Sequence, residues 1–473
     1  MEFTLSPMAK GFLPYSLEQR ILLPPDLRDW LPEGHLALVI SDVVAALDLS
    51  ELLLDHRSKD PRGRAGYHPA MMLTLLIYAY CIGKPSSRKI EKATYEDVAF
   101  RVISANQHPD HDAIADFRKR NLSAFSGLFA QVLSLCREAG LVKLGHVAID
   151  GTKIQANASK HKAMSYERMD PAQKKLQDEI DALLAEAERV DAEEDVKHGK
   201  GKRGDELPQE LARRETRLRK IQEAKERLEA EAKERASDKA AEVRAELERR
   251  AKNEIATGKK IGGPTPKTPD PQDAQPDAKA QKNFTDPDSR IMPNSAHKGA
   301  FVQGYNAQIA VDAEAQIIVA LDVTQQTNDR KQLVPMAKKI VANCGQLAQN
   351  TSADNGYFSE QAVNDPQLSS TELLVPPGRE RVSTSAPSTE PAPDAPAKEQ
   401  MRYKLASPKG RALYKMRKAI VEPVFGQIKE ARGFRRFSLR GLDQVHAEFS
   451  LIALTHNLLK LFRAGAPVRT RAA

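Results

Sequence analysis

Three carboxylates in this chain lie where acids could act together on a phosphate ester. Asp150 follows the apolar run 144–149, Asp354 follows the run 350–353, and Glu422 lies in a basic C-terminal segment. Acids that converge on one point repel each other, and an unpaired buried carboxylate is costly. Divalent cations relieve both effects, and two ions about 4 Å apart can activate an attacking oxygen and stabilise a leaving one. The three acids are therefore candidate magnesium ligands.

Each acid also has an ordinary structural explanation when it is taken alone. Asp150 and Asp354 could be turn residues at strand ends, and Asp354-Asn355-Gly356 is a good turn sequence whatever its role. The case for a shared site therefore depends on the elements that position the acids.

The elements after residue 140 alternate between strands and helices. We expect a strand ending at Asp150, a hairpin of strands 301–311 and 316–324, helix 332–344, strand 350–353, helix 359–364, strand 373–375, and helices 408–429 and 443–462, the first of these two broken or kinked at Pro423. This is the order of an RNase H-like mixed sheet flanked by helices, although other α/β folds share it. In that fold the first and fourth strands are adjacent, so Asp150 and Asp354 would share a site, and a helix packed across the sheet could bring Glu422 to it.

The rest of the chain divides by composition. Residues 1–140 are expected to form a helical N-terminal domain with helices 68–83, 86–101, 113–120 and 123–139, and Asp110 or Asp112 caps the third. The catalytic domain would comprise 141–164 and 281–473. Between its parts lie a charged helical insertion, 165–262, and a proline-rich linker, 263–280; residues 382–398 have the composition of a disordered loop.

The insertion carries a partial heptad that consists of Leu211, Leu218, Ile221 and Leu228. This predicts one or two long helices, a weak coiled coil, with a break at 199–204. A solvated helical insertion without chemistry is the simplest explanation for it.

Composition excludes several classes of protein. The 473 residues have a net charge of +8, and the longest apolar stretch, 70–82, is too short to cross a bilayer. Cys81, Cys136 and Cys344 have neither disulfide-framework nor zinc-site spacing, which is typical of a cytoplasmic protein. Gly262-Gly263 lacks the strand–loop–helix context of a nucleotide-binding loop, so no nucleotide cofactor is expected.

Basic charge is concentrated at the C-terminal end. Residues 401–473 contain 16 Lys and Arg against 4 Asp and Glu, a net charge of +12 that exceeds the +8 of the whole chain. Tyr414, Phe434 and Phe437 are interleaved with these cations. Such a patch suits a polyanion backbone, although a solvated basic helix is the alternative.

These motifs together resemble the DDE transposases of bacterial insertion sequences that carry a Tyr-Arg-Glu-Lys signature. The resemblance rests on AIDGTKIQAN around Asp150, TSADNGYFS around Asp354 and RKAIVEPVFGQIK around Glu422, with support from 68–83, 283–292 and 304–312. The family spacing is Tyr, two residues, Arg, three residues, Glu, six residues, Lys. Tyr414, Arg417, Glu422 and Lys429 fit it, except that four residues separate Arg417 from Glu422. Lys418 holds the expected basic position, so either cation could carry the family's role.

The resemblance implies a magnesium-dependent polynucleotidyl transferase that nicks DNA at the ends of an insertion sequence and joins the freed 3′ hydroxyl to target DNA. Asp150, Asp354 and Glu422 would hold Mg²⁺, for which Mn²⁺ could substitute, and the residues expected to contact double-stranded DNA are Tyr414, Arg417, Lys418, Lys429, Arg432, Arg435 and Arg436. The N-terminal helices would help to bind the terminal inverted repeats.

The same resemblance implies a homodimer, because two ends must be cut together, and a cytoplasmic protein that is nucleoid-associated when it is bound to DNA. Two alternatives remain. One is an RNase H-fold nuclease that cuts without joining, and the other is a catalytically inactive DNA-binding protein.

Overall fold

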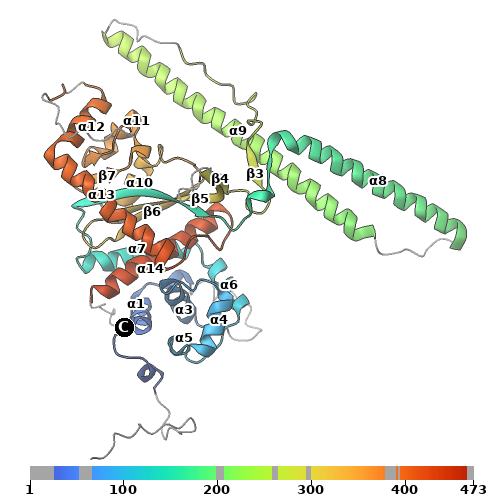
Figure 1. The fold of residues 1–473 in the computed structure, drawn as a ribbon, viewed down its shortest axis with the longest axis horizontal. Coiled ribbons are helices and arrows are strands. Elements are labelled where there is room, and N and C mark those ends of the chain that lie inside the picture. The colour runs from blue at the N-terminus through green and yellow to red at the C-terminus, as the bar shows by residue number, and fades with distance from the viewer. Residues whose placement is uncertain are drawn as a thin grey trace, which may run out of the picture.

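A six-stranded mixed sheet lies at the centre of the molecule, with a helical N-terminal region joined to it through the C-terminal helix 442–463 and a two-helix arm projecting from one side (Figure 1). The computed structural model describes residues 26–52, 66–198, 207–257, 265–293, 300–378, 390–392 and 395–465. The strands of the sheet are β1 (His146–Gln155), β4 (Arg290–Pro293), β5 (Phe301–Asp312), β6 (Ile318–Thr324), β7 (Asn350–Ala353) and β8 (Glu372–Leu374).

The sheet has the neighbour relations of an RNase H-like domain. β5 pairs antiparallel with β1 and, on its other edge, with both β4 and β6. β1 pairs parallel with β7, and β7 pairs parallel with β8. The predicted fold class is confirmed, and the first and fourth strands of the predicted order are neighbours.

The prediction that Asp150 ends the first strand is wrong. The pairing of β1 with β5 runs from Val147 opposite Asp312 to Gln155 opposite Gly304, so Asp150 lies in the middle of β1. The pairing with β7, by contrast, stops at Ile149 opposite Ala353. Asp150 is therefore the first residue of β1 beyond the end of the parallel pair, which is why it still faces the residue that follows β7.

Helices cover the sheet: α10 (Leu333–Cys344), α11 (Glu360–Val363), α12 (Ala397–Ala406), α13 (Pro408–Gly426) and α14 (Leu442–Arg463), with short turns η3 (Asn355–Tyr357) and η4 (Pro366–Leu368) and the π-helical turn η5 (Gln427–Ala431). α13 packs across β1, β5 and β7. The predicted disordered loop overlaps the start of α12, so it is wrong at Ala397 and Lys398. Residues 382–389 and 393–394 of that loop lie outside the described residues.

Of the break or kink predicted at Pro423, the break is wrong, because α13 continues through Pro423 to Gly426. A proline inside a helix leaves the carbonyl four residues earlier without its N–H partner. Here that carbonyl, on Ala419, accepts a hydrogen bond of 3.0 Å from the side-chain amide of Gln316. The missing backbone bond is thus replaced by a side chain of the β5–β6 turn.

The N-terminal region is helical, as predicted: η1 (Leu27–Trp30), α1 (Leu36–Ala46), α3 (Pro69–Cys81), α4 (Ser87–Glu96), α5 (Val98–Ile103), α6 (His111–Arg120) and α7 (Ala124–Glu138). The predicted helix 86–101 is two helices, because Asp97 is extended and its carboxylate caps α5. Asp110 caps α6 by accepting the Ala113 N–H at 2.6 Å.

One hydrophobic core joins this region to the sheet. α14 packs against α3, α7 and β6, and buried side chains form a single cluster from Ala37 to Leu461. The thiols of Cys81, Cys136 and Cys344 are free and buried in that cluster. None of the described helices is long and apolar enough to cross a membrane.

The insertion forms the arm, which consists of α8 (Tyr166–His198) and α9 (Leu207–Thr257) (Figure 1). Ile221 and Leu228 of the predicted heptad are buried against Met169 and Leu176 of α8, and Leu218 packs on this cluster. The predicted break at 199–204 lies outside the described residues. At the base of the arm, β2 (Ala163–Ser165) pairs with β3 (Gln281–Asn283), and the turn η2 (Lys160–Lys162) precedes it. Residues 265–280 of the predicted linker contain neither helix nor strand.

Candidate active site

Asp150 and Asp354 come together where β1 extends beyond β7. Burial raises the pKa of Asp150 to about 6; the charge of Asp354 adds to that rise, while Arg417 and the Gly151 N–H oppose it. Burial also raises the pKa of Asp354, against the opposing effects of the Gly356 N–H and of Arg417. The charge of Asp329 adds to the rise at Asp354, so the acids share one weakly hydrated site in which neighbouring carboxylates disfavour each other's charge.

Local backbone groups fix both carboxylates. One oxygen of Asp150 accepts the Gly151 N–H at 2.8 Å. One oxygen of Asp354 accepts the Gly356 N–H, also at 2.8 Å, because Asp354 is the N-cap of η3. Asp354-Asn355-Gly356 is thus both the turn that its sequence predicts and one wall of the site.

Arg417 of α13 neutralises the acid pair. Its Nη1 lies 3.1 Å from Oδ2 of Asp150, and the two side chains are only 8% and 19% exposed. The guanidinium also lies over the ring of Tyr414, 5.9 Å from its centroid. Lys418 is exposed on the outside of the helix. Of the two cations that the sequence left open, Arg417 is the one in contact with the acid pair.

Glu422 is not at the acid pair in this structure. Arg417, Ile420, Val421 and Val424 form the buried face of α13. At 3.6 residues per turn, Glu422 lies on the opposite face, where it is exposed. Among the described residues, no group of three or more His, Cys, Asp or Glu side chains is arranged to hold a metal ion. The structure thus brings together two of the three predicted acids.

The two partly buried acids nevertheless fit a magnesium ion. Mg²⁺ is usually held by one or two carboxylates, with waters and substrate phosphates completing its octahedral shell. Asp150 and Asp354 supply two carboxylates whose pKa values are raised by burial and by a neighbouring aspartate, Asp354 for the first and Asp329 for the second. A bound dication would offset both costs.

A fourth carboxylate, Asp329, lies beside the pair and was missed by the sequence reasoning. Its Oδ1 accepts hydrogen bonds from the amides of Asn306 and Gln308, each at 2.6 Å. A Cβ on Gly151 would lie 2.8 Å from this oxygen, and a Cβ on Gly356 would lie 3.7 Å from the other. Asp329 therefore fills the space that these two glycines leave next to the acid pair.

Lys153 completes this network. Its ammonium lies 3.8 Å from Asp329 and is mostly buried, and burial lowers the pKa of Lys153 while the three nearby aspartates oppose that shift. The Tyr357 hydroxyl donates to the side-chain amide oxygen, Oε1, of Gln308. A signal for this cluster was present in the sequence: Asn306 and Gln308 are polar at alternate positions of an apolar strand, which places both on one face.

The basic segment after α13 divides into buried and exposed cations. Lys429 donates to the Thr152 hydroxyl and to the Lys153 carbonyl, which ties η5 to β1. Arg432 is buried and donates to Thr455 and the Ile452 carbonyl of α14. The burial of Arg432 is at odds with a direct contact between this side chain and DNA. Arg435 and Arg436 are exposed and pair with Glu430 and Gln155, respectively.

The aromatic residues of this segment are part of the core. Phe434 and Phe437 are 2% and 1% exposed, respectively, so the expectation that aromatic rings interleave with the cations on a surface patch is wrong for both. The ring of Phe434 stacks on that of Tyr80 in α3, which joins the segment to the N-terminal helices.

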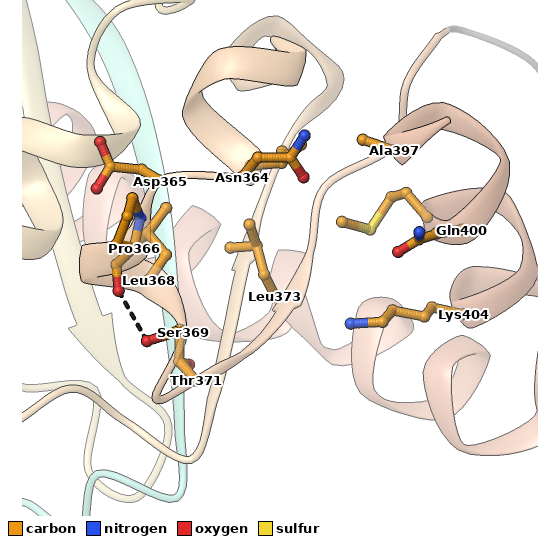
Figure 2. Close-up of a pocket in the computed structure, with 12 residues that line it drawn as sticks. Asn364, Asp365, Pro366, Leu368, Ser369, Thr371, Leu373, Ala397, Gln400 and Lys404 are labelled. Carbon is orange, nitrogen blue, oxygen red and sulfur yellow. Dashed lines mark hydrogen bonds between the residues drawn. The ribbon is translucent and has the colours of Figure 1, made fainter. Parts of the chain in front are cut away.

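A separate hollow of about 280 Å³ lies between η4 and α12 (Figure 2). Its lining includes Asp365, Gln400 and Lys404 but neither Asp150 nor Asp354. The side chains labelled in Figure 2 are predominantly neutral. We therefore place the candidate active site at the acid pair.

Two family models match this chain. Residues 25–120, the N-terminal helices, match a family model described as a transposase domain (DUF772), and residues 266–458 match one described as a transposase DDE domain. β1 with Asp150 precedes the second match because the arm separates it from the rest of the sheet. No curated protein and no solved structure gives a significant match. With both transposase domains in order on one chain, the protein belongs to the DDE transposases of insertion sequences.

Proposed function

We propose that this transposase cuts DNA at the ends of an insertion sequence and joins the freed 3′ hydroxyl to target DNA with the help of Mg²⁺. The observation that supports this most directly is the partly buried pair Asp150 and Asp354, held by backbone amides and with Arg417 paired to Asp150. Two fixed carboxylates beside a cation are the arrangement that a phosphodiester and its metal ions require.

Asp150 and Asp354 would hold the metal ions, and Mn²⁺ could replace Mg²⁺. When bound, these ions would lower the pKa of the attacking water and stabilise the leaving oxygen. Glu422 is the proposed third acid. It is exposed on the same helix as Arg417, and its carboxylate has no ion pair with any described residue, so it is available to ligands at the surface.

The cations of the site have separate proposed tasks. Arg417 and Lys153 place positive charge beside the acids, where the charge of a scissile phosphate would otherwise be repelled. Tyr414, Lys418, Lys429, Arg435 and Arg436 are the remaining proposed DNA contacts, and Arg432 would support the segment from inside. The expected partners are double-stranded DNA, as terminal repeats and as target, and a second copy of the chain. The proposed location is the cytoplasm, at the nucleoid when the protein is bound to DNA.

The test uses the purified full chain and labelled duplexes that carry the terminal repeats of its own element. Nicking and joining are followed with Mg²⁺, with EDTA, and for Asp354→Asn beside the exposed control Glu360→Gln. We expect metal-dependent joining that Asp354→Asn abolishes and Glu360→Gln preserves. Cutting without joining would favour the nuclease, and binding without either would favour an inactive DNA-binding protein. Activity that survives Asp354→Asn would overturn the site.

A further inference from the structure

We infer that a second site, in the hollow between the N-terminal helices and the end of β1, binds a phosphate of the DNA backbone at a fixed distance from the acid pair. This inference rests on the proposed function. The hollow has a volume of about 520 Å³, and its lining includes Ser86, Arg88, His111, Arg118, Asn157 and Arg436. The first four belong to the N-terminal transposase domain, whereas Asn157 and Arg436 belong to the sheet domain.

The N-terminus of α4 supplies unpaired donors to this hollow. The N–H groups of Ser87, Arg88 and Lys89 precede the first helical hydrogen bond, which Ile90 makes to Ser86. None of the three has a hydrogen-bond partner among the described residues, and the N-cap Ser86 makes no side-chain cap. The first turn carries no acid. Open N–H groups and the helix dipole together favour an anion at such an end.

A buried arginine forms part of the floor. The Arg118 side chain donates to the Pro85 carbonyl at 2.9 Å and lies 3.4 Å from the Ser87 hydroxyl, so it fixes the start of α4. Arg118 is 8% exposed, and its Nε is buried without a hydrogen-bond partner. Burial raises the pKa of the Glu448 carboxyl, and the positive charge of Arg118 opposes this rise. Arg118 thus contributes a fixed positive charge to the wall of the hollow.

The opposite wall comes from the strand-like segment after η5. Arg436 donates to the side chain of Gln155 at 3.1 Å and is exposed, so its guanidinium has donors left for a ligand. Asp112 is the one acid of the lining; its side chain is 87% exposed and lies 3.7 Å from His111. Three arginines therefore face a single solvated carboxylate, and the hollow favours an anion.

The position of the hollow relates it to the acid pair. Arg436 forms a bridge with Gln155, which is five residues beyond Asp150 on β1. Five residues of strand span about 17 Å. One strand of a DNA duplex advances about 3.4 Å along its axis per phosphate. A duplex whose scissile phosphate lies at Asp150 and which follows β1 would therefore place a phosphate roughly five nucleotides away in the hollow.

This arrangement gives the interdomain contact a function. The N-terminal and catalytic domains would grip one backbone at a set separation, so a terminal repeat engaged by the first domain would be in register for the second. The hollow is open at the surface, which suits a phosphate that remains part of a polymer better than a small molecule that must be enclosed.

The first experiment compares Arg88→Ala with Lys89→Ala. The two residues are adjacent, exposed and of the same charge, but only Arg88 lines the hollow. Both variants keep the backbone N–H groups of α4. Binding to the terminal-repeat duplex is measured over a range of salt concentrations. We expect Arg88→Ala to lose several-fold in affinity and to reduce the slope of log K against log salt by about 1. Lys89→Ala should leave both values within error. Equal slopes for the two variants would overturn the inference.

The second experiment locates the phosphate. Single methylphosphonates, which remove one backbone charge each, are placed along the terminal duplex. The wild-type protein should lose affinity at a position about five nucleotides from the scissile bond, and Arg88→Ala should lose little more there. If both proteins respond equally at every position, the inference fails. Inorganic phosphate that competes without any positional effect would also overturn it, in favour of a free-anion site.

These measurements are separable from the proposed function. All of them use binding alone, and they can be repeated on Asp354→Asn, in which cleavage is expected to be absent. A positional effect in a wild-type protein that never cleaves the duplex would contradict the proposed chemistry and leave this phosphate site standing. Cleavage by the wild type without any positional effect would contradict the phosphate site and leave the proposed chemistry standing.

Discussion

The inner and outer faces of α13 and η5 carry the same kinds of residue and use them in opposite ways. On the inner face, Arg417 is buried against Asp150, and Lys429 donates to β1. On the outer face, Lys418 and Glu422 are exposed, one helical turn apart. Arg417 and Lys418 are consecutive cations, yet only the first is coupled to the acids. The net charge of the segment includes both cations equally. Only the orientation of the helix distinguishes the buried Arg417 from the exposed Lys418.

This difference assigns distinct energetic consequences to the two faces. Charges on the inner face interact in a weakly hydrated site, where removal of one partner leaves the other uncompensated. Charges on the outer face are screened by water and salt and contribute little to folding. Outer charges remain free to meet a polyanion, so their effect should appear in DNA binding and cleavage rather than in stability.

The largest expected effect concerns Glu422, an exposed residue of the outer face. The contrast between the two faces would fail if this residue had no effect on DNA cleavage. If Glu422 completes the metal site in the DNA complex, Glu422→Gln should lower the cleavage rate by more than about a hundredfold, since a lost ligand costs several kcal/mol of transition-state stabilisation. The free energy of unfolding of the DNA-free protein should not change measurably. Rates come from single-turnover cleavage, and stability comes from urea unfolding.

The matched control for this variant is Glu430→Gln, which alters an exposed acid on the same segment. It should retain wild-type cleavage to within a few-fold. If Glu422→Gln also keeps full activity, Glu422 is an ordinary surface residue, and the acid pair must work without it.

The second expectation contrasts Arg417→Ala with Lys418→Ala. Loss of Arg417 leaves Asp150 buried without its cation, which should reduce the free energy of unfolding by on the order of 3 kcal/mol at pH 8. Loss of Lys418 should change it by less than about 0.5 kcal/mol. Urea unfolding of the two variants measures the difference directly. Equal stabilities would contradict the division into two faces.

The third expectation is a pH dependence that belongs to the inner face alone. The native pKa of Asp150 is raised from 3.8 to about 6. Its contribution to the stability of the metal-free protein is therefore fully present below about pH 4 and is lost as the pH rises through about 6. Metal binding has the opposite sign, because a divalent ion needs the ionised carboxylate.

Mn²⁺ affinity should thus fall by up to about tenfold for each pH unit below 6, and titration calorimetry between pH 5 and 8 measures this. Glu422→Gln should reproduce the wild-type profile in the absence of DNA, because Glu422 is exposed and lies on the other face of the helix. A flat profile for the wild type would show that the acid pair does not bind the metal.

Local sequence was sufficient for most of the fold. The apolar alternation of β5 and β6, the cap at Asp110 and the turn after Asp354 are all set by neighbouring residues, so the element order and the fold class could be predicted. The pairing of Asp150 with Asp354 followed from that order, because adjacent parallel strands place their following residues at one edge.

Long-range contacts account for what the sequence did not show. The extension of β1 past Asp150 depends on its pairing with β5, whose partner residues lie 149 to 157 positions further along the chain. The continuity of α13 at Pro423 depends on the Gln316 side chain, and the burial of Phe434 and Phe437 depends on α3 and α14. Asp329 belongs to the site only because Asn306 and Gln308 face it from another strand. None of these is a property of a local window.

The smallest expected effect concerns Arg435, which sharpens the comparison at its outer limit. Its side chain and that of its partner Glu430 are each 62% exposed, so the ion pair is worth little to folding. Arg435→Ala should leave the melting temperature within about 1 °C of wild type while it lowers the salt slope of DNA binding by about 1. Arg432→Ala provides the opposite control, because Arg432 is buried against α14 and should lower stability before it affects binding. If Arg435→Ala lowers the melting temperature and leaves DNA binding unchanged, the charge of Arg435 stabilises the fold. Exposure alone would then not identify the residues that contact DNA.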